Sequence, residues 1–281
     1  IVPAPAHYQV VSFGRLVEES YLLPNSHPRD RYKLTHWAIS QPIPTKVMVF
    51  GAARFAVQYP PQSQSITIEN WVYPEDREVG FDRFTPPAEV LLLSENILGP
   101  YPYQKLANVQ SKTQYGGMEN ATAIFYNESV IIDQPSIEAL IAHEIAHQWF
   151  GNSVSEKNWA DVWLSEGFST YLTHLYFEYT YGRDSMANRI VADKERIFTF
   201  HLQTPEAKVV DSDESNLFQL LNANTYQKGA WVLHMLRFTV GDEVFFNVLR
   251  QFFDRYKHHN ASTNDFIALA SKLSRRDLSE F

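Results

Sequence analysis

The sequence contains no cysteine among its 281 residues. This absence excludes disulfide bonds and metal sites with thiolate ligands, and it leaves the cellular compartment open. The chain also lacks any run of about 18 apolar residues, the length that a membrane-spanning helix requires, so we expect no transmembrane segment. A basic surplus is missing too. The formal net charge is −8, so the chain lacks the basic footprint of a nucleic-acid-binding protein and we expect no nucleic-acid partner.

The residues that are present suffice for a large core, because 44% of them are hydrophobic. Stretches rich in β-branched and aromatic residues predict strands over residues 8–13, 32–39, 46–56 and 65–72. A helix over 85–98 and strands over 106–110 and 121–126 follow. After Pro135, apolar periodicity predicts helices over 136–151, 159–181, 184–203, 223–239, 242–257 and 263–274. Strands followed by helices predict an α+β fold.

The segment His143-Glu144-Ile145-Ala146-His147 has the most specific chemistry in the chain. Positions four apart lie on one face of a helix, so both imidazoles can reach one ion. Glu166 lies in the next predicted helix, which could return antiparallel and present its carboxylate. Two imidazoles and one carboxylate predict a three-ligand zinc site with an open position for water. Two buried histidines beside a carboxylate with no ion would be costly to desolvate.

Glu144 lies about 100° around the helix from His143, where it could act on a ligand of the ion without binding the ion itself. Two other residues have chemistry that the local sequence leaves open. Glu119 could receive an ammonium group, although a solvated turn glutamate is the commoner case. Tyr226 could donate a hydrogen bond to an oxyanion, although an ordinary tyrosine at a helix start explains it as well. Asp161 could orient a ligand histidine or cap the second helix, and we favour the cap.

Taken together, these segments resemble the zinc aminopeptidases that include aminopeptidase N and leukotriene hydrolase. The resemblance covers roughly residues 45–255, and it is specific because four motifs coincide in order and spacing. The four motifs are Gly116-Gly117-Met118-Glu119-Asn120, His143-Glu144-Ile145-Ala146-His147-Gln148-Trp149-Phe150-Gly151-Asn152, Trp163-Leu164-Ser165-Glu166-Gly167-Phe168 and Tyr226-Gln227-Lys228-Gly229. The loop Gly99-Pro100-Tyr101-Pro102-Tyr103 resembles the family's segment before the first motif.

The resemblance implies a thermolysin-like catalytic domain with a β-rich lobe, a helical lobe and one Zn2+ ion between them. It implies hydrolysis of the first residue from peptides with a free N-terminus. The roles that it assigns are zinc ligands (His143, His147 and Glu166), general base (Glu144), oxyanion donor (Tyr226), amine anchor (Glu119) and substrate-binding edge strand (Gly116, Gly117 and Met118).

The family pattern also implies flanking domains of the same polypeptide. Residues 1–57 resemble the tail of a saddle-shaped β-domain, and residues 58–281 resemble the catalytic domain, which the family often extends with a helical domain. Thr173 departs from the pattern, because many members carry a glutamate there. Three alternatives stay open: a gluzincin endopeptidase, a zinc domain without catalysis, and epoxide chemistry of the leukotriene-hydrolase kind.

Overall fold

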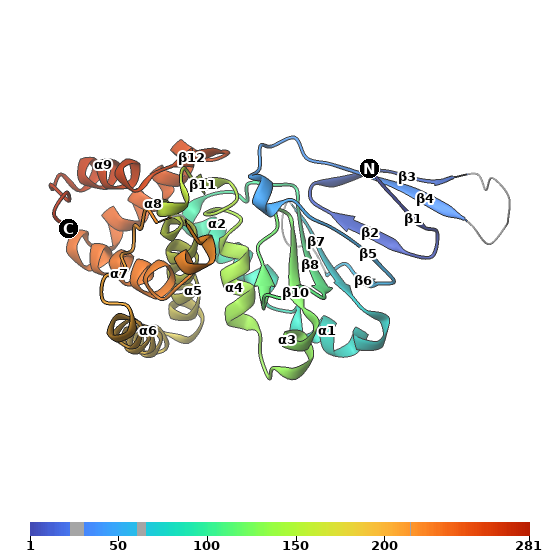
Figure 1. Ribbon diagram of the computed structural model, residues 1–281, viewed down its shortest axis with the longest axis horizontal. Helices are drawn as coiled ribbons and strands as arrows, with labels where there is room; N and C mark the ends of the chain where they lie inside the picture. The colour runs from blue at the N-terminus through green and yellow to red at the C-terminus, as the bar shows by residue number, and fades with distance from the viewer. Residues whose placement is uncertain (23–30, 61–65, 214) are drawn as a thin grey trace. The chain divides into compact units, whose positions relative to one another are not determined.

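The structure, a computed structural model, describes residues 1–22, 31–60, 66–213 and 215–281. The chain divides into two compact units, and the division falls within one helix, α4 (Glu138–Ala146). The first unit comprises Ile1–Glu89 and Tyr103–Glu144, and the second comprises Val90–Pro102 and Ile145–Phe281. Strands dominate the first unit and helices dominate the second (Figure 1), so the predicted α+β class is confirmed.

A five-stranded sheet forms the centre of the first unit, with strand order β6-β7-β8-β10-β9 (Figure 1). Its strands are β6 (Ala56–Gln58), β7 (Thr67–Val72), β8 (Lys105–Ser111), β9 (Gly117–Met118) and β10 (Ala123–Asn127). The pairs β7–β8 and β8–β10 are parallel, whereas β6 and β9 are antiparallel edge strands. Every residue of β8 is buried, as expected for a strand covered on both faces. Because β9 is the last strand of the sheet, one side of its backbone is not paired within the sheet and can pair with another strand.

Two smaller β-structures belong to the same unit. A three-stranded sheet has the order β1-β4-β3, and β2 pairs with β5 in a separate ribbon. The bounds are β1 (Val2–Pro5), β2 (Gln9–Ser12), β3 (Arg15–Leu22), β4 (Tyr32–Ala38) and β5 (Phe50–Ala53). The core joins the ribbon to the central sheet through buried apolar residues, which include Val11, Phe55, Trp71, Val109 and Phe125. Two short helices, α1 (Arg77–Arg83) and α3 (Glu128–Asp133), pack beside the sheet.

Helix α5 (Trp163–Tyr181) is the central element of the second unit, because its first fourteen residues are all buried. The surrounding elements are α6 (Arg183–Gln203), α7 (Gly229–Val240), α8 (Asp242–Tyr256), α9 (Thr263–Ser274) and the parallel pair β11 (Val154–Glu156) and β12 (His259–Ala261). Aromatic rings hold α5 to its neighbours. The Phe168 ring centroid lies 5.1 Å from that of Phe266 and 6.0 Å from that of Phe252. Burying the whole start of α5 fixes the position of Glu166 on it.

Several predicted boundaries differ from the observed ones. The helix predicted over 136–151 ends at Ala146, because the chain turns after His147. The helix predicted from residue 159 begins as a 3₁₀ turn at Trp159–Asp161, and the one predicted from 223 begins as a π-turn, η5 (Asn224–Lys228). The strand predicted over 46–56 begins as a 3₁₀ turn, η1 (Thr45–Val47), and then divides between β5 and β6.

Six observed elements were not predicted, most of them too short to show a clear period: β1, β3, β11, β12, α1 and α3. Ser65, where a strand was predicted to begin, lies outside the described residues. The helix predicted over 85–98 is confirmed as α2 (Pro87–Leu98), which begins two residues later than predicted. Long periodic segments were therefore predicted better than short ones.

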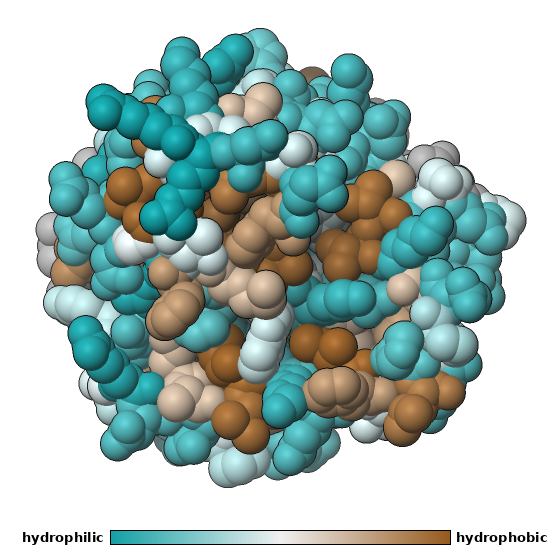
Figure 2. Space-filling model, turned by 90° about the vertical axis from the view of Figure 1, so that its left-hand side faces the viewer, coloured by the Kyte–Doolittle hydropathy of each residue, from teal (hydrophilic) through white to brown (hydrophobic). Residues whose placement is uncertain are grey.

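The surface of the helical unit carries large apolar side chains. Phe238 is 91% exposed, Leu202 is 83% exposed and Phe218 is 67% exposed. Figure 2 shows brown apolar groups interspersed among teal hydrophilic ones on the face that it presents. Over the described ranges, none of the helices combines the length and the apolar character that crossing a bilayer requires.

Candidate functional site

Helix α4 carries the first histidine of the predicted metal site, and the second follows directly after its last residue. The Ser136 hydroxyl accepts a hydrogen bond from the Glu138 amide at 3.3 Å, which supports the helix start. Ile141 and Ile145 are fully buried and fix the apolar face. His143 is half-buried, whereas His147 is only 2% exposed. The buried histidine is therefore held in one orientation by its surroundings.

Two oxygens define the protonation of His147. Its Nδ1 lies 3.1 Å from the Phe150 carbonyl oxygen and 3.1 Å from Ser165 Oγ. A carbonyl oxygen can only accept a hydrogen bond, so Nδ1 is protonated and donates a hydrogen bond to that oxygen. The other ring nitrogen, Nε2, is then the acceptor atom, which is the form in which a histidine binds a metal.

Gly151 allows this arrangement of His147 and Ser165. Its φ is +122°, a conformation that side chains other than glycine rarely adopt. A Cβ atom at this position would lie 2.3 Å from Ser165 Oγ and 2.9 Å from His147 Nδ1. A glycine is therefore required both for the turn and for the contact between the two side chains.

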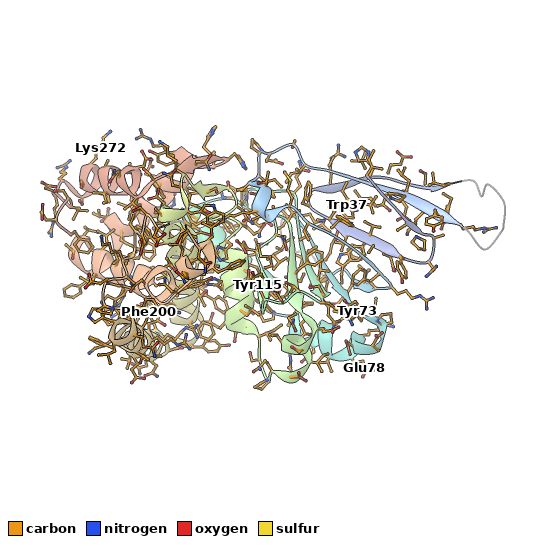
Figure 3. All side chains as sticks on the ribbon, viewed as in Figure 1. Trp37, Tyr73, Glu78, Tyr115, Phe200 and Lys272 are labelled. Carbon is orange, nitrogen blue, oxygen red and sulfur yellow. The ribbon has the colours of Figure 1, made fainter. Side chains whose placement is uncertain are left out.

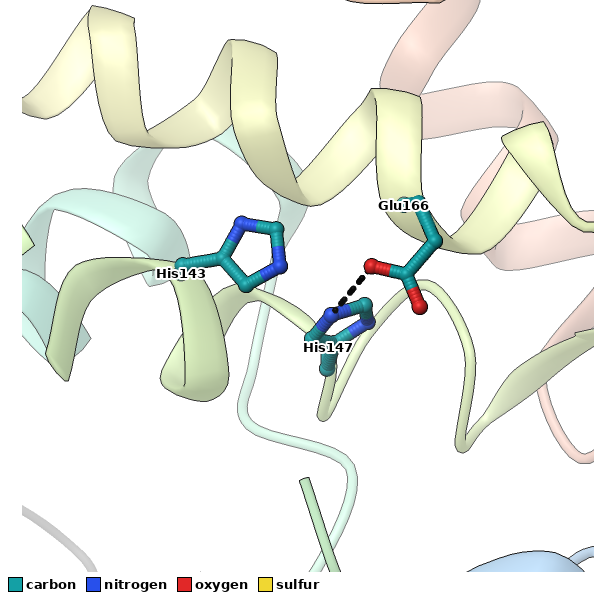
Figure 4. Close-up of side chains that lie close together, drawn as sticks. All are labelled: His143, His147 and Glu166. Carbon is teal, nitrogen blue, oxygen red and sulfur yellow. Dashed lines mark ion pairs between the residues drawn. The ribbon is translucent and has the colours of Figure 1, made fainter. Parts of the chain in front are cut away.

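The three predicted metal ligands come together in the structure. One nitrogen each from His143 and His147 and one oxygen from Glu166 all lie within 4.8 Å of one another (Figure 4). His147 Nε2 and Glu166 Oε2 are 3.2 Å apart (Figure 4). Two ligands about 2.0–2.1 Å from a tetrahedrally coordinated ion are separated by about 3.3–3.4 Å. The observed separation and the set of two imidazoles and one carboxylate therefore fit the ligands of one divalent metal ion.

Glu144 lies against the edge strand of the central sheet. Glu144 is only 5% exposed. A Cβ atom at Gly117 would lie 2.5 Å from Glu144 Oε1 and 2.7 Å from Glu144 Cδ. The glycine therefore lets the backbone of β9 approach the carboxyl group. Gly116 has no such role, because its nearest heavy atoms, on Leu140 and Val130, would be 3.9 Å away.

Tyr226 lies on the π-turn η5, which packs against α5. Gly167, the residue after Glu166, approaches the backbone of Gly229 so closely that a Cβ on Gly167 would lie 2.9 Å from Gly229 Cα. The same Cβ would lie 3.1 Å from the Thr225 carbonyl oxygen. The two glycines thus bring the turn that carries Tyr226 beside the turn that carries Glu166. π-Turns within helices frequently occur at functional sites.

Glu119 follows β9 directly and is half-buried, so it is not the fully solvated turn residue that its local sequence favoured.

The expectation for Asp161 was wrong. Its Oδ1 accepts hydrogen bonds from the Thr263 amide at 2.9 Å and the Thr263 hydroxyl at 2.7 Å, so it ties the start of α9 and neither caps α5 nor contacts a ligand histidine. Thr173 is buried and donates to the Ser169 carbonyl within α5.

Sequence reasoning missed Ser165, Gly151, Gly167 and Gly229 as residues that shape the site. Their positions in the sequence could have indicated them. Ser165 and Gly167 flank Glu166, Gly151 lies in the turn after His147, and Gly229 lies three residues after Tyr226. Glycines at such places often permit close approach of another backbone or side chain.

Comparison with known proteins gives a family. Residues 87–281 match the Peptidase family M1 domain, which confirms the family predicted from the motifs. Curated relatives include Aminopeptidase M1-C of Oryza sativa subsp. japonica, which is 32% identical over an alignment of 193 positions; the match covers 62% of this chain and 21% of that protein. Another is Aminopeptidase N of Lactococcus lactis subsp. lactis, which is 32% identical over an alignment of 185 positions; the match covers 59% of this chain and 21% of that protein. The matched part thus spans about a fifth of the length of these relatives.

Solved structures show the same fold. The M1 zinc metallopeptidase from Deinococcus radiodurans superimposes with a TM-score of 0.78 at 22% identity, covering 96% of this chain and 59% of that one. A variant of that enzyme bound to a Tyr-Ser-Ala substrate superimposes with a TM-score of 0.77 at 22% identity, covering 97% of this chain and 60% of that one. The chain described here therefore belongs to peptidase family M1.

Proposed function

We propose that this chain is the catalytic part of a zinc-dependent aminopeptidase, which removes the first residue from peptides with a free N-terminus. The observation that carries the proposal is the group formed by half-buried His143 and buried His147 and Glu166, whose ligand atoms all lie within 4.8 Å of one another. The M1 family match supports the same reaction class. The general base would come from Glu144, on the same helix as His143.

The donor set supports zinc as the metal, with one ion per chain. Two imidazole nitrogens and one carboxylate oxygen are a ligand set of catalytic zinc sites. When bound, zinc supplies a Lewis acid for the scissile carbonyl and lowers the pKa of a bound water to about 7. The three side chains would hold the ion and leave its fourth position open.

Glu144 would act first as base and then as acid. Its carboxylate would take a proton from the attacking water and later pass this proton to the nitrogen of the departing amine. The contact with Gly117 supports this role, because it keeps the carboxyl group beside the edge strand. A base that is already held in the reactive position adds little entropic cost to the activation barrier.

Tyr226 and the segment from Gly116 to Glu119 would position the substrate. The Tyr226 hydroxyl would donate a hydrogen bond to the oxyanion of the tetrahedral intermediate, and such a donor is typically worth about 3–4 kcal/mol. The free edge of β9, formed by Gly117 and Met118 with Gly116 beside it, would pair with the substrate backbone. Glu119 would accept the α-ammonium group of the first residue, so that cleavage stops after a single residue.

A panel of aminoacyl-aminomethylcoumarin substrates, measured with and without a chelator, tests the proposal. We expect hydrolysis that the chelator abolishes and zinc restores, and much slower cleavage of N-acetylated peptides than of free ones. Glu119→Ala should reduce this preference for free N-termini, and Glu144→Gln should abolish turnover while zinc stays bound. Equal cleavage of free and acetylated peptides would indicate an endopeptidase. Zinc binding without any hydrolysis would indicate a silent binding domain.

We also propose that flanking domains accompany this chain in the whole protein, with residues 1–57 as the tail of an N-terminal β-domain. The exposed side chains of Phe238, Leu202 and Phe218 support this, because large apolar groups favour contact surfaces. Aminoacyl-amide hydrolysis by this chain and by a longer form tests the idea. Equal rates and equal thermal stability of the two forms would contradict it.

A further inference from the structure

The turn that follows α4 holds His147 in place. Within it, the Phe150 amide donates a hydrogen bond to the Ala146 carbonyl oxygen at 3.2 Å. The Asn152 amide donates to the His147 carbonyl oxygen at 3.0 Å. The turn so formed places the Phe150 carbonyl oxygen 3.1 Å from His147 Nδ1, where it accepts a hydrogen bond from the ring. A group that fixes this turn therefore also fixes the orientation of the His147 ring.

The loop after α2, residues 99–102, is a rigid segment of the same unit. Gly99 has a φ of +105°, and its amide donates to the Glu95 carbonyl oxygen at 2.9 Å. The Tyr101 amide donates to the Glu95 carboxylate at 3.0 Å. Each of the two prolines in the loop fixes one backbone torsion angle. The loop is therefore tied to the end of α2 and can serve as a fixed support.

Side chains of the turn contact this loop. Trp149 Nε1 donates a hydrogen bond to the Gly99 carbonyl oxygen at 3.2 Å, and the Tyr101 hydroxyl donates one to Gln148 Oε1 at 3.4 Å. The rings of Tyr101 and Trp149 also meet edge to face, with their centroids 5.3 Å apart. Tyr101, Gln148 and Trp149 are all buried, so their polar groups depend on partners within the protein.

Apolar rings pack against the same turn. The Phe150 ring centroid lies 4.7 Å from that of Phe168 and 6.1 Å from that of Phe252. Side chains fill the space between the helices of the second unit (Figure 3), so a residue that moves displaces its neighbours. Trp149 and Phe150 are consecutive in the chain, so a shift of Trp149 would move the Phe150 carbonyl oxygen relative to His147 Nδ1.

We propose that Tyr101 is a positioning residue for the metal site. Its ring and hydroxyl hold the turn, and the turn keeps the Phe150 carbonyl oxygen on His147 Nδ1, so that Nε2 stays directed toward Glu166. This role rests on the proposed function, because it requires that the site binds a metal. Groups that hydrogen-bond a metal-binding histidine typically change metal affinity by about 10–100-fold when they are replaced. Tyr101 acts through further contacts, so we expect Tyr101→Leu to lower zinc affinity by about threefold to tenfold.

Chelator competition with Zn2+ alone measures this loss in the whole chain. Ser165 Oγ is the second oxygen near His147 Nδ1, so in Ser165→Ala the ring depends on the Phe150 carbonyl oxygen. If Tyr101 acts through that carbonyl, the loss of zinc affinity caused by Tyr101→Leu should be at least about threefold larger in the Ser165→Ala background than in the unaltered protein. A residue that only stabilises the fold would give the same loss in both backgrounds, because independent effects add in free energy.

Phe245→Leu is the matched control, because Phe245 is fully buried in α8 and its ring packs on Tyr171 and Phe246. This variant should lower the urea midpoint about as much as Tyr101→Leu, and it should leave zinc affinity unchanged in both backgrounds. Loading with Co2+ gives a second readout, because the visible absorption of Co2+ depends on its coordination geometry. Tyr101→Leu should alter this spectrum, whereas Phe245→Leu should not.

Tyr101→Phe keeps the ring and guards against a leucine variant that fails to fold. It removes only the hydroxyl that reaches Gln148, so in the Ser165→Ala background it should lower zinc affinity by about twofold to threefold. Zinc affinity that neither variant changes, or equal losses in the two backgrounds, would overturn the inference and leave the proposed function standing. An unaltered protein that binds neither Zn2+ nor Co2+ would overturn both proposals, so the two failures are distinguishable.

Discussion

Replacing Gly117 by alanine tests how the edge strand and the general base are coupled. The new Cβ would lie 2.5 Å from Glu144 Oε1, 2.7 Å from Cδ and 2.8 Å from Cγ. Ordinary contact begins at 3.4 Å, so the carboxyl end must move by about 0.6–0.9 Å. All three atoms are affected, and Glu144 is buried, so the side chain has little room to move without leaving its place.

The expected loss follows from this displacement. A misplacement of about 1 Å at a reacting group costs about 10²-fold in rate, so we expect kcat/KM to fall by about that factor. This corresponds to about 2.7 kcal/mol in the activation barrier. The free energy of unfolding should fall by about 1–3 kcal/mol, because the added methyl group overpacks a buried side chain, but the chain should stay folded since Gly117 does not need a positive φ.

Kinetics of aminoacyl-aminomethylcoumarin hydrolysis, together with urea denaturation and zinc content, would check this prediction. Gly116→Ala is the matched control, since its Cβ would meet nothing closer than 3.9 Å, and we expect a loss of less than about fivefold. Near-normal kcat/KM in the Gly117 variant would refute the reasoning. Loss of bound zinc or of folded structure would also contradict the prediction, because the added Cβ is expected to displace only the Glu144 carboxyl group.

Three further predictions concern the second unit. Ser165→Ala removes one acceptor from His147 Nδ1, so zinc affinity measured by chelator competition should fall by about tenfold with the fold intact; unchanged affinity would contradict this role. Arg237→Met removes the guanidinium group that lies 2.6 Å from the Glu178 carboxylate. The Glu178 side chain is only 19% exposed, so losing its partner should lower the free energy of unfolding by about 2–3 kcal/mol. A loss below about 0.5 kcal/mol in urea denaturation would argue against this. Burial, followed by the charge of Arg237, lowers the pKa of His234, whereas Glu178 raises it. The stability that depends on neutral His234 is therefore fully present above about pH 6.5 and is lost as the pH falls through the lowered folded-state pKa; urea midpoints between about pH 5 and 8 should show this slope in wild type and a flatter one in His234→Gln.

The sequence was sufficient to predict which three side chains form the candidate metal site, because the helical period places the two histidines on one face of α4. His143 and His147 are one turn apart whatever packs around them, and Glu166 lies in the next long helix. The α+β class followed for a similar reason, since strand-rich and helix-rich halves differ in periodicity over many residues. The α+β class, which was predicted from apolar periodicity over long segments, is confirmed.

Features that depend on tertiary contacts could not be predicted from the sequence. The helix α4 ends at Ala146 rather than at Gly151, because the turn after it brings the Phe150 carbonyl to His147 Nδ1. The π-turn at Tyr226 accompanies the close contact between Gly167 and Gly229, two segments about sixty residues apart. Asp161 bonds to Thr263, about a hundred residues away. Local propensity contains no information on such partners.

Anomalous diffraction at the zinc absorption edge, from crystals of protein supplied with zinc, tests the central claim most directly. We predict a single peak per chain, about 2.0–2.2 Å from one nitrogen each of His143 and His147 and from one carboxylate oxygen of Glu166. The absence of a peak at these three residues, or a peak held by other side chains, would contradict the account.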